Sequence, residues 1–320
     1  MNIIPIAFAF DSSWTDPACI SLSSLMINAH KSTFYDIFII HSKSEMLDKN
    51  KLDLIPQCFK NCNIKYIEID NTFDNSFEIR GITTTTYYRL LIPTLIPEYD
   101  KIIYSDVDVI FREDLWDIYS TTDLSNNYIA GVNSLSYLIP DVKTYYENHL
   151  KLDSHNTIYA GNIILNSKAL REDGIVDIFI KMAGEKYRFQ DMDIINLVCS
   201  NKINYLSPTF CVTTYFSDLY VNRKEELLKV WNEQDLDRAL KSGIIHYNGQ
   251  KPWKGYCINF DIWWEYYRKS PFFNAKKYYD FFQRKLNDYD TLSLWKRIKI
   301  LVRYFTYSPN ESKNRLISGF

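Results

Sequence analysis

The first 110 residues alternate between short apolar runs and segments of helical character, and this order limits the fold more than any other feature of the chain. The run Ile3–Phe10 is apolar throughout, which is typical of a strand buried on both faces. Further strands are predicted at 35–41, 63–70 and 101–106, with helices at 18–31, 84–95 and 43–61, the last interrupted near Pro56. Strands and helices in this order form a mostly parallel sheet with helices on both faces. We therefore predict an α/β fold with a Rossmann-like sheet.

The second half of the chain is more mixed, and its last part differs in charge. Strands are predicted there at 127–132 and 159–166, a helix at 190–199, and a strand running into a loop at 243–253. Residues 266–320 contain 12 Lys/Arg and 4 Asp/Glu, a net charge of +8, whereas residues 1–265 contain 25 Lys/Arg and 35 Asp/Glu, a net charge of −10. We therefore expect a body, 1–265, followed by a basic, aromatic helical tail, 266–320.

The tail contains an apolar stripe at helical spacing with cations between its members. The apolar positions are Leu294, Trp295, Ile298, Leu301, Val302 and Phe305, and the cations are Lys296, Arg297, Lys299 and Arg303. A basic amphipathic helix with aromatic residues can lie on an anionic membrane surface. It can also dock on an acidic body such as this one. The sequence leaves both arrangements open, and we favour the membrane surface.

The overall composition excludes several classes of protein. A formal net charge of −2 predicts no bulk attraction to nucleic acid. The six cysteines lack zinc-finger spacing, so we expect reduced thiols. No apolar run is long enough to span a bilayer, and the N-terminus lacks the basic region of a signal peptide. We expect a soluble cytoplasmic protein that can bind peripherally to the inner face of the cell membrane.

Two carboxylates, Asp106 and Asp108, follow directly on the apolar run at 101–105. In an extended backbone, residues i and i+2 point to the same side, so both side chains can aim at one point. Two like charges held this close repel unless a cation lies between them. Asp235/Asp237 and Asp288/Asp290 have the same spacing but lie in segments typical of solvated helices. We therefore predict a divalent-metal site at the first pair.

His246 follows the strand predicted near 243–246, and Gly249 and Lys251 come soon after it. A turn with these residues can present an imidazole, an open backbone N–H and a cation to a phosphate. Two carboxylates and one imidazole suit manganese somewhat better than magnesium. Asp11 follows the first predicted strand, at the carboxyl edge where such sheets bind ligands. Together these residues predict a site for a metal-bound nucleoside diphosphate.

Six motifs make the chain resemble glycosyltransferase family 8, the group that includes bacterial lipopolysaccharide α-galactosyl- and α-glucosyltransferases and glycogenin. They are Phe8-Ala9-Phe10-Asp11, Thr85-Thr86-Tyr87-Tyr88-Arg89-Leu90, Tyr104-Ser105-Asp106-Val107-Asp108, Ala160-Gly161, Gln190-Asp191-Met192-Asp193 and His246-Tyr247-Asn248-Gly249-Gln250-Lys251-Pro252-Trp253. The resemblance covers roughly residues 3–265. It implies a GT-A fold and a hexosyltransferase that retains the α configuration of the transferred glucose or galactose.

The resemblance also implies roles for individual residues. The residues that match the metal ligands, for Mn²⁺ or Mg²⁺, are Asp106, Asp108 and His246. The residues that match contacts to the nucleotide of a UDP-sugar are Phe8, Ala9, Asp11, Ser13, Val107, Gly249 and Lys251. Those that match the sugar site are Arg89, Tyr159, Ala160, Gly161, Asp191 and Met192, with Arg89 and Asp191 as the catalytic candidates.

The chain departs from the family pattern at three positions around the expected sugar site. Tyr159 stands where the family often has Asn, Met192 where galactosyltransferases have Gln, and Ser134 where some members have a carboxylate. The identity of the sugar therefore stays open. Because a Met side chain cannot act as a carboxylate or amide nucleophile would, we expect front-face attack, with Asp191 orienting the sugar and a diphosphate oxygen helping to remove the acceptor proton.

Two other functions remain open at this point. A phosphatase of the haloacid dehalogenase type also uses Asp-x-Asp after an apolar strand, although its motif usually opens the domain and here about a hundred residues precede it. A non-catalytic UDP-sugar-binding protein would keep the metal and nucleotide residues. The expected partners of a transferase are a UDP-hexose donor and a carbohydrate, glycolipid or glycoprotein acceptor.

Overall fold

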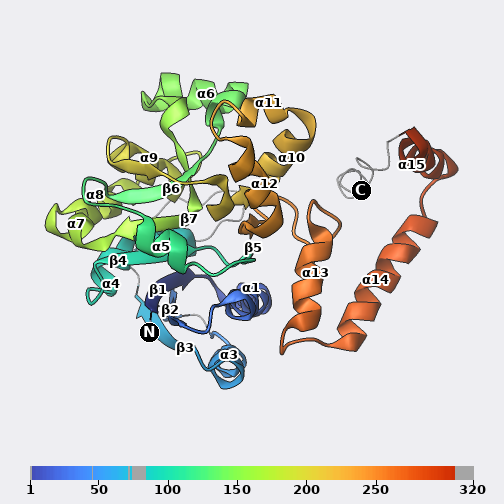
Figure 1. The fold of residues 1–320 in the computed structure, drawn as a ribbon, viewed down its shortest axis with the longest axis horizontal. Helices are drawn as coiled ribbons and strands as arrows, with labels where there is room; N and C mark the ends of the chain where they lie inside the picture. Colours follow the sequence, from blue (N-terminus) through green and yellow to red (C-terminus); the bar gives the residue numbers. More distant parts are fainter. Residues whose placement is uncertain (1, 45, 71–72, 74–83, 307–320) are drawn as a thin grey trace.

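A seven-stranded sheet forms the centre of the computed structural model, which describes residues 2–44, 46–70, 73 and 84–306. Its strands are β1 (Asn2–Ala9), β2 (Thr33–Ser42), β3 (Cys62–Ile69), β4 (Lys101–Ser105), β6 (Ile129–Asn133), β7 (Ile158–Asn166) and β8 (Ile203–Tyr205). Their spatial order is β3-β2-β1-β4-β7-β6-β8. All of these strands except β8 are labelled in Figure 1. All run parallel except β7, which is antiparallel to β4 and β6. The predicted α/β class with a mostly parallel sheet is confirmed.

Helices and short helical turns cover the sheet. Those of the first half are η1 (Ser12–Trp14), α1 (Thr15–Asn28), α2 (Lys49–Leu52), α3 (Leu54–Cys58), η2 (Thr84–Leu91), α4 (Ile92–Leu95) and α5 (Trp116–Thr121). Those of the second half are η3 (Ser136–Leu138), α6 (Pro140–Thr144), η4 (Tyr145–Leu150), η5 (Ser154–Asn156), α7 (Ser167–Glu172), α8 (Ile175–Ala183), α9 (Asp191–Cys199), η6 (Pro208–Phe210), α10 (Thr214–Asn222), α11 (Lys224–Leu227) and α12 (Glu233–Ser242).

Both faces of the sheet are buried because β1 is apolar at successive positions, whose side chains alternate between the faces. Ile6 and Phe8 share one hydrophobic cluster with Leu22 of α1. Ala7 faces the other way and shares a second cluster with Ile194 of α9. Because β1 and β4 pair in parallel, the carboxyl ends of both strands lie at the same edge of the sheet.

A small second sheet joins two segments that are far apart in the sequence. It consists of β5 (Val109–Ile110), β9 (Val212–Thr213) and β10 (Ile245–His246). β10 lies in the middle, antiparallel to β5 and parallel to β9. The register places His246 opposite Val109. The imidazole therefore lies next to the carboxylates that follow β4.

Three predicted elements differ in detail from the structure. The helix predicted at 84–95 is a 3-10 segment, η2, followed by the short α4, where Pro93 lacks the N–H of a regular helix. The helix predicted at 43–61, with an interruption near Pro56, begins only at Lys49 and is divided into α2 and α3 at Asp53. The segment predicted as a strand running into a loop at 243–253 forms a strand of only two residues, β10, before its loop. Short strands and 3-10 turns carry little periodic signal, which explains these differences.

The tail forms three helices, α13 (Phe260–Lys269), α14 (Ala275–Asp290) and α15 (Leu294–Thr306) (Figure 1). The body was expected to end at residue 265, which lies inside α13, and the flanking Trp264 and Tyr266 belong to one aromatic cluster with Phe281 of α14. Leu294, Trp295, Ile298 and Val302 of α15 are exposed. The side chains of Leu301, Arg303 and Phe305, and residues 307–320, lie outside the described residues. Among the described helices, none combines the length and hydropathy needed to cross a bilayer.

Candidate functional site

Backbone hydrogen bonds fix the Asp106–Asp108 segment where it leaves β4. The Asp106 amide donates to the carbonyl oxygen of Gly161 in β7 at 2.7 Å, and the Tyr247 amide donates to the carbonyl oxygen of Asp108 at 2.9 Å. One bond ties the segment to the main sheet and the other ties it to the end of β10. The two carboxylates are therefore held between β7 and β10.

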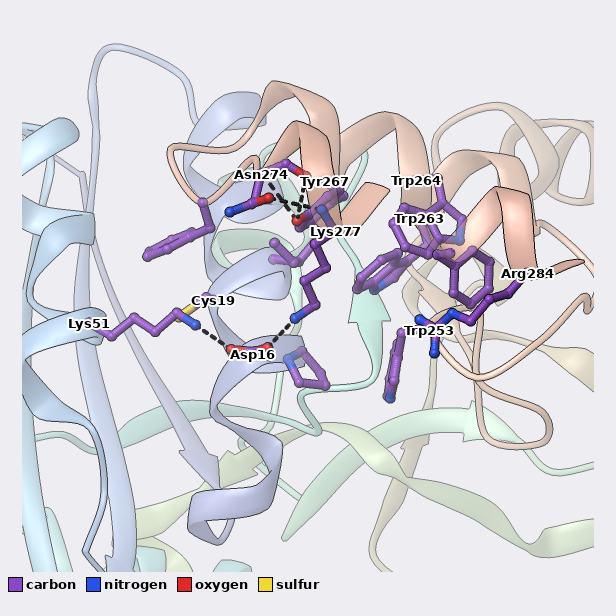
Figure 2. A pocket seen from close by; sticks show the side chains of 14 residues that line it. Asp16, Cys19, Lys51, Trp253, Trp263, Trp264, Tyr267, Asn274, Lys277 and Arg284 are labelled. Carbon is purple, nitrogen blue, oxygen red and sulfur yellow. Dashed lines mark hydrogen bonds and ion pairs between the residues drawn. The ribbon is translucent and has the colours of Figure 1, made fainter. Parts of the chain in front are cut away.

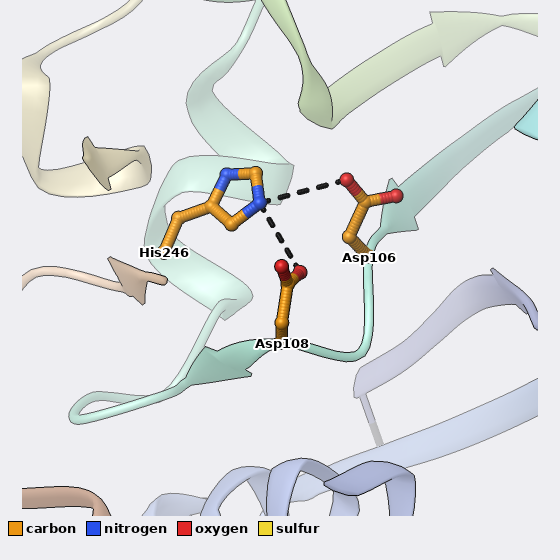
Figure 3. Close-up of side chains that lie close together, drawn as sticks. All are labelled: Asp106, Asp108 and His246. Carbon is orange, nitrogen blue, oxygen red and sulfur yellow. Dashed lines mark ion pairs between the residues drawn. The ribbon is translucent and has the colours of Figure 1, made fainter. Parts of the chain in front are cut away.

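Asp106, Asp108 and His246 converge on one point (Figure 3). Nε2 of His246 lies 3.6 Å from Oδ2 of Asp106 and 3.2 Å from Oδ1 of Asp108. One ligand atom from each residue lies within 4.8 Å of the other two. Oxygen ligands of one divalent ion, at bond lengths of about 2.0–2.6 Å, stand at most roughly 4–5 Å apart. The three side chains thus have the spacing and the chemistry of a metal site.

The electrostatics of this cluster also fit a cation. Burial lowers the pKa of His246, but the charge and hydrogen bond of Asp108 outweigh it and raise the pKa to about 10. Burial likewise acts to raise the pKa of Asp108, but His246 and Lys251 hold it below its usual value. A field that favours a proton on a buried imidazole also favours a divalent ion there, bound by a neutral imidazole and two carboxylates. Mn²⁺ and Mg²⁺ both accept such a set.

Two neighbours restrict the imidazole of His246. Its Nδ1 faces the sulfur of Cys211 at 3.7 Å, so Nε2 points at the carboxylates. A Cβ on Gly161 would collide with the ring of His246 and lie 2.7 Å from Oδ2 of Asp106. Only glycine therefore lets β7 approach the cluster this closely.

Arg89 of η2 links this cluster to Asp191. Its guanidinium donates to Oδ1 of Asp106 at 2.9 Å and to the carbonyl oxygen of Ala160 at 2.8 Å. Its Nε lies 3.1 Å from Oδ2 of Asp191, and its face lies 4.4 Å from the ring centroid of Tyr104. Arg89 is 7% exposed, so it is a buried cation between two carboxylates and not a helix-surface charge.

Asp191 begins α9 and is buried beside the cluster. The Thr86 hydroxyl donates to its Oδ1 at 2.7 Å. Burial raises the pKa of Asp191 to about 6, although Arg89 and Thr86 oppose this shift. The preceding Gln190 has φ 48° and ψ −120°, a left-handed conformation that a non-glycine residue adopts only at a cost. This turn directs the start of α9 towards the site.

Lys251 lies on the other side of the carboxylate pair. Its Nζ donates to Oδ2 of Asp108 at 2.5 Å and lies 5.5 Å from the ring centroid of Trp14. Gly249 lies further out: a Cβ there would meet only Thr214, at 3.6 Å. The predicted turn therefore places its imidazole and its lysine at the carboxylates and leaves its glycine open.

A cavity of about 620 Å³ lies over these residues. The predicted site residues that line it are Ala9, Asp11, Arg89, Asp106, Val107, Asp108, Tyr159, Ala160, Gly161, Asp191, Met192, His246 and Lys251. The structure thus brings most of the predicted metal, nucleotide and sugar residues to one cavity at the carboxyl edge of the sheet.

Three predicted site residues do not line this cavity. The ring of Phe8 is fully buried in the core and packs edge-on against Phe111, with centroids 6.4 Å apart. Ser13 is exposed, and its hydroxyl donates to Oδ1 of Asp11 at 2.5 Å. Gly249 lies outside the lining, as described above. Ser134, at one of the departures from the family pattern, is buried and bonds to Thr157 at 2.6 Å.

Several lining residues were missed by the sequence analysis: Phe10, Trp14, Thr85, Thr86, Phe189, Gln190 and Asn248. Most of them lie inside the six motifs named above, so the motifs could have predicted them. Trp14 and Phe189 lie outside the motifs. An aromatic residue beside a motif is more often part of the core, so the sequence offered no signal for these two.

Comparison with known proteins agrees with this arrangement. A model of the family described as "Glycosyl transferase family 8" matches residues 5–257. A putative glycosyltransferase of Haemophilus influenzae is 24% identical over 299 residues, which cover 85% of this chain and 84% of that protein. General stress protein A of Bacillus subtilis is 25% identical over 250 residues, which cover 72% of this chain and 80% of that protein.

Solved structures show the same fold. The apo structure of the bifunctional glycosyltransferase WbbM aligns with a TM-score of 0.71 and 22% identity, covering 87% of this chain and 51% of WbbM, so the chain spans about half of that protein. The galactosyltransferase LgtC, solved in complex with donor and acceptor sugar analogs, aligns with a TM-score of 0.67 and 20% identity, covering 85% of this chain and 98% of LgtC. The GT-A fold is thereby confirmed, and the resemblance seen in the six motifs holds over most of the chain: this protein belongs to glycosyl transferase family 8.

Proposed function

We propose that this protein is a retaining hexosyltransferase that moves glucose or galactose from a UDP-sugar to a glycan, glycolipid or glycoprotein, with Mn²⁺ or Mg²⁺ as cofactor. The observation that carries the proposal is the convergence of Asp106, Asp108 and His246 within 4.8 Å, at a cavity also lined by Arg89 and Asp191. The first three residues would hold the cation that binds the diphosphate, and Arg89 and Asp191 would hold the sugar, so one cavity could take both halves of a nucleotide-sugar donor.

The nucleotide part of the donor would bind near the end of β1. Ala9 and Asp11 line the cavity there and are assigned to the uracil and ribose, and the backbone of Val107 is assigned to the ribose. Phe8 supports this segment from the core. Ser13 supports it through its bond to Asp11, which also accepts from the Ser13 amide at 2.9 Å.

Leaving-group departure is the step that the charged cluster would assist. Asp106, Asp108 and His246 would hold the divalent cation, which when bound offsets the charge that develops on the diphosphate as the sugar C1–O bond breaks. Lys251 lies beside Asp108 and would supply a second positive charge to the same oxygens. Gly249 would let the backbone approach the diphosphate.

The sugar would bind between Arg89, Asp191 and the end of β7. Tyr159, Ala160, Gly161 and Met192 line this part of the cavity. We assign to Asp191 the orientation of the sugar hydroxyls and propose front-face attack, in which the acceptor hydroxyl enters on the side that the diphosphate leaves and gives its proton to a diphosphate oxygen. Met192 offers no anionic nucleophile for a covalent intermediate. A mass spectrum of trapped enzyme with hexose attached to Asp191 would contradict the front-face mechanism.

The two alternatives receive less support. If the protein were a phosphatase, His246 and Lys251 would have no role beside Asp108. The match to the glycosyltransferase family over residues 5–257 also favours a transferase. A non-catalytic binder is the alternative that activity measurements must exclude. We further propose a cytoplasmic location, with the tail attached to the inner face of the cell membrane.

The test is a panel of nucleotide sugars with and without Mn²⁺, read first by thermal shift and then by hydrolysis of the donor. UDP-glucose or UDP-galactose should raise the melting temperature only when the metal is present, and UDP should be released. Asp108→Asn should abolish both effects, whereas Asp237→Asn, an exposed carboxylate on α12, should leave both unchanged. Metal-independent stabilisation by every nucleotide would overturn the proposed donor site.

A further inference from the structure

A second cavity lies between α1, α13 and α14 (Figure 2). Its volume is about 450 Å³, within the range of roughly 300–1,000 Å³ that is typical of small-molecule sites. Trp253 lines this cavity and packs edge-on against Trp14, which lines the cleft described above, with ring centroids 5.8 Å apart. The two cavities are therefore neighbours with separate linings.

The walls of the second cavity are aromatic. They are formed by Trp253, Trp263, Trp264, Tyr267, Phe272 and Phe281, together with Ile20 and Pro17 of α1. Trp263 and Tyr267 stack with an interplanar angle of 7° and centroids 5.7 Å apart. Such walls can bury the apolar part of a ligand.

The charged groups of the cavity are mostly cations. Lys51 and Lys277 both bond to Asp16, which neutralises one of them (Figure 2). Arg284 also lines the cavity; its Nε donates to the carbonyl oxygen of Asp280 in its own helix, and among the described residues it forms no ion pair. Three cations against one carboxylate leave a net charge of +2 at this site.

This chemistry argues against a sugar as the ligand. A sugar hydroxyl both donates and accepts hydrogen bonds, so a sugar site needs acceptors as well as aromatic faces. Here the carboxylate of Asp16 is already bonded to two lysines, and Oδ1 of Asn274 accepts from the Lys277 amide. Among the charged residues that line the cavity, Arg284 is the one without an ion pair in the described part of the chain, and its guanidinium has a planar fork of donors that matches a phosphate.

We propose that this cavity binds a phosphate-bearing lipid, with its apolar chain against the tryptophan walls and its phosphate on Arg284. Lys277 adds positive potential from the same helix, and its ammonium keeps donors beyond the one used by Asp16. This site is distinct from the donor cleft, and its occupancy does not depend on transferase activity.

The test uses dodecyl phosphate below its critical micelle concentration, measured by calorimetry and by tryptophan emission on the metal-free protein. Dodecyl glucoside, with the same chain and a neutral head, and inorganic phosphate, with no chain, should each bind at least about tenfold more weakly. Saturating UDP and Mn²⁺ should leave the affinity for dodecyl phosphate unchanged, because the linings are separate.

Arg284→Gln should weaken dodecyl phosphate binding about tenfold, the loss expected for a charge-assisted hydrogen bond. Lys276→Gln is the matched control, since it removes one exposed charge from the same helix outside the cavity and should change the affinity by less than about twofold. Equal losses in both variants, equal binding of dodecyl glucoside, or competition by UDP and Mn²⁺ would each overturn the proposal.

Discussion

Gly161 lies directly against the predicted metal site. Gly161→Ala would place a Cβ against the ring of His246 and 2.7 Å from Oδ2 of Asp106, so we expect Mn²⁺ affinity to fall by at least about tenfold. The measurement is Mn²⁺ binding followed by electron paramagnetic resonance, with no nucleotide present.

Gly249→Ala is the control for this prediction, because a Cβ at Gly249 would make only ordinary contacts with Thr214, at 3.6 Å and beyond. Both variants replace a glycine by alanine near the same site. If Gly161→Ala binds Mn²⁺ as tightly as Gly249→Ala does, the three side chains do not share one ion in the arrangement described here.

Asp191→Asn should stabilise the folded protein at neutral pH while it removes transferase activity. Burial raises the pKa of Asp191 from 3.8 to about 6, so between these values the folded protein holds a proton that the unfolded chain has released. The free energy of unfolding then falls as pH rises through this window and levels off above about pH 6. The variant lacks this titration and should be more stable at about pH 7.5 by about 1–3 kcal/mol.

Urea unfolding at about pH 4 and at about pH 7.5 measures this difference. The gain in free energy of unfolding should appear at the higher pH and shrink at the lower one. Asp237→Asn, on the exposed face of α12, should show no such change with pH. A gain of equal size at both pH values would mean that the buried charge of Asp191 is not its source.

At the scale of single residues, the sequence predicted the site where several motifs indicated the same chemistry. Asp106, Asp108 and His246 were predicted as one cluster and lie together. Phe8 was assigned to the segment that lines the nucleotide pocket, and its side chain lies in the core, because Phe8 and Ala9 point to opposite faces of β1 and a motif does not say which one faces the ligand. Trp14 was missed because its position depends on tertiary contacts with Trp253.

At the scale of elements, the small sheet β5-β10-β9 decides where His246 lies. The sequence predicted a strand ending near 246, but a strand of two residues has no period from which its partners can be inferred. The long apolar strands β1, β2 and β4 were predictable, since continuous burial leaves a clear pattern. The 3-10 form of η2 was not, because its spacing resembles that of an α-helix over so short a length.

Arg112 holds this small sheet against the end of α12. Its guanidinium donates to the carbonyl oxygens of Ala239, Leu240 and Gly243, at 2.6, 2.6 and 2.7 Å. These carbonyls lie at the C-terminal end of α12, where the last acceptors of a helix lack helical partners, although the Ala239 carbonyl oxygen also accepts from the Gly243 amide at 3.1 Å. Arg112→Lys keeps the positive charge but loses the planar set of guanidinium donors. The free energy of unfolding should therefore fall by about 2 kcal/mol in a urea titration.

Arg238→Lys is the matched control for Arg112→Lys. Arg238 pairs with Glu113 at 3.1 Å on the surface, where an ion pair contributes about 0–1 kcal/mol. Arg112→Lys should also weaken Mn²⁺ binding, because α12 leads directly into β10. If Arg112→Lys lowers the stability strongly but leaves the metal affinity unchanged, the small sheet does not control the position of His246.

At the scale of the whole molecule, charge is divided between an acidic body and a basic tail, a net −10 against +8. The predicted boundary at residue 265 falls within α13, whose Trp263 and Trp264 share a hydrophobic cluster with Ile20 of α1 and Phe281 of α14. The body–tail contact therefore uses aromatic residues as well as charge. The exposed apolar residues of α15 remain available for another surface.

A protein that ends at Asp290 should lose its binding to anionic vesicles. The truncation removes the exposed Leu294, Trp295, Ile298 and Val302 together with the basic residues between them, and leaves α13 and α14 in place. The full chain should sediment with vesicles containing anionic lipid at low salt, less so at about 0.5 M salt, and little with zwitterionic vesicles, because attraction to anionic lipid is screened by salt. Trp295→Ser should weaken binding without changing the charge, which separates apolar insertion from electrostatic attraction. Sedimentation of the truncated protein with anionic vesicles at low salt would show that the membrane contact lies elsewhere on the molecule.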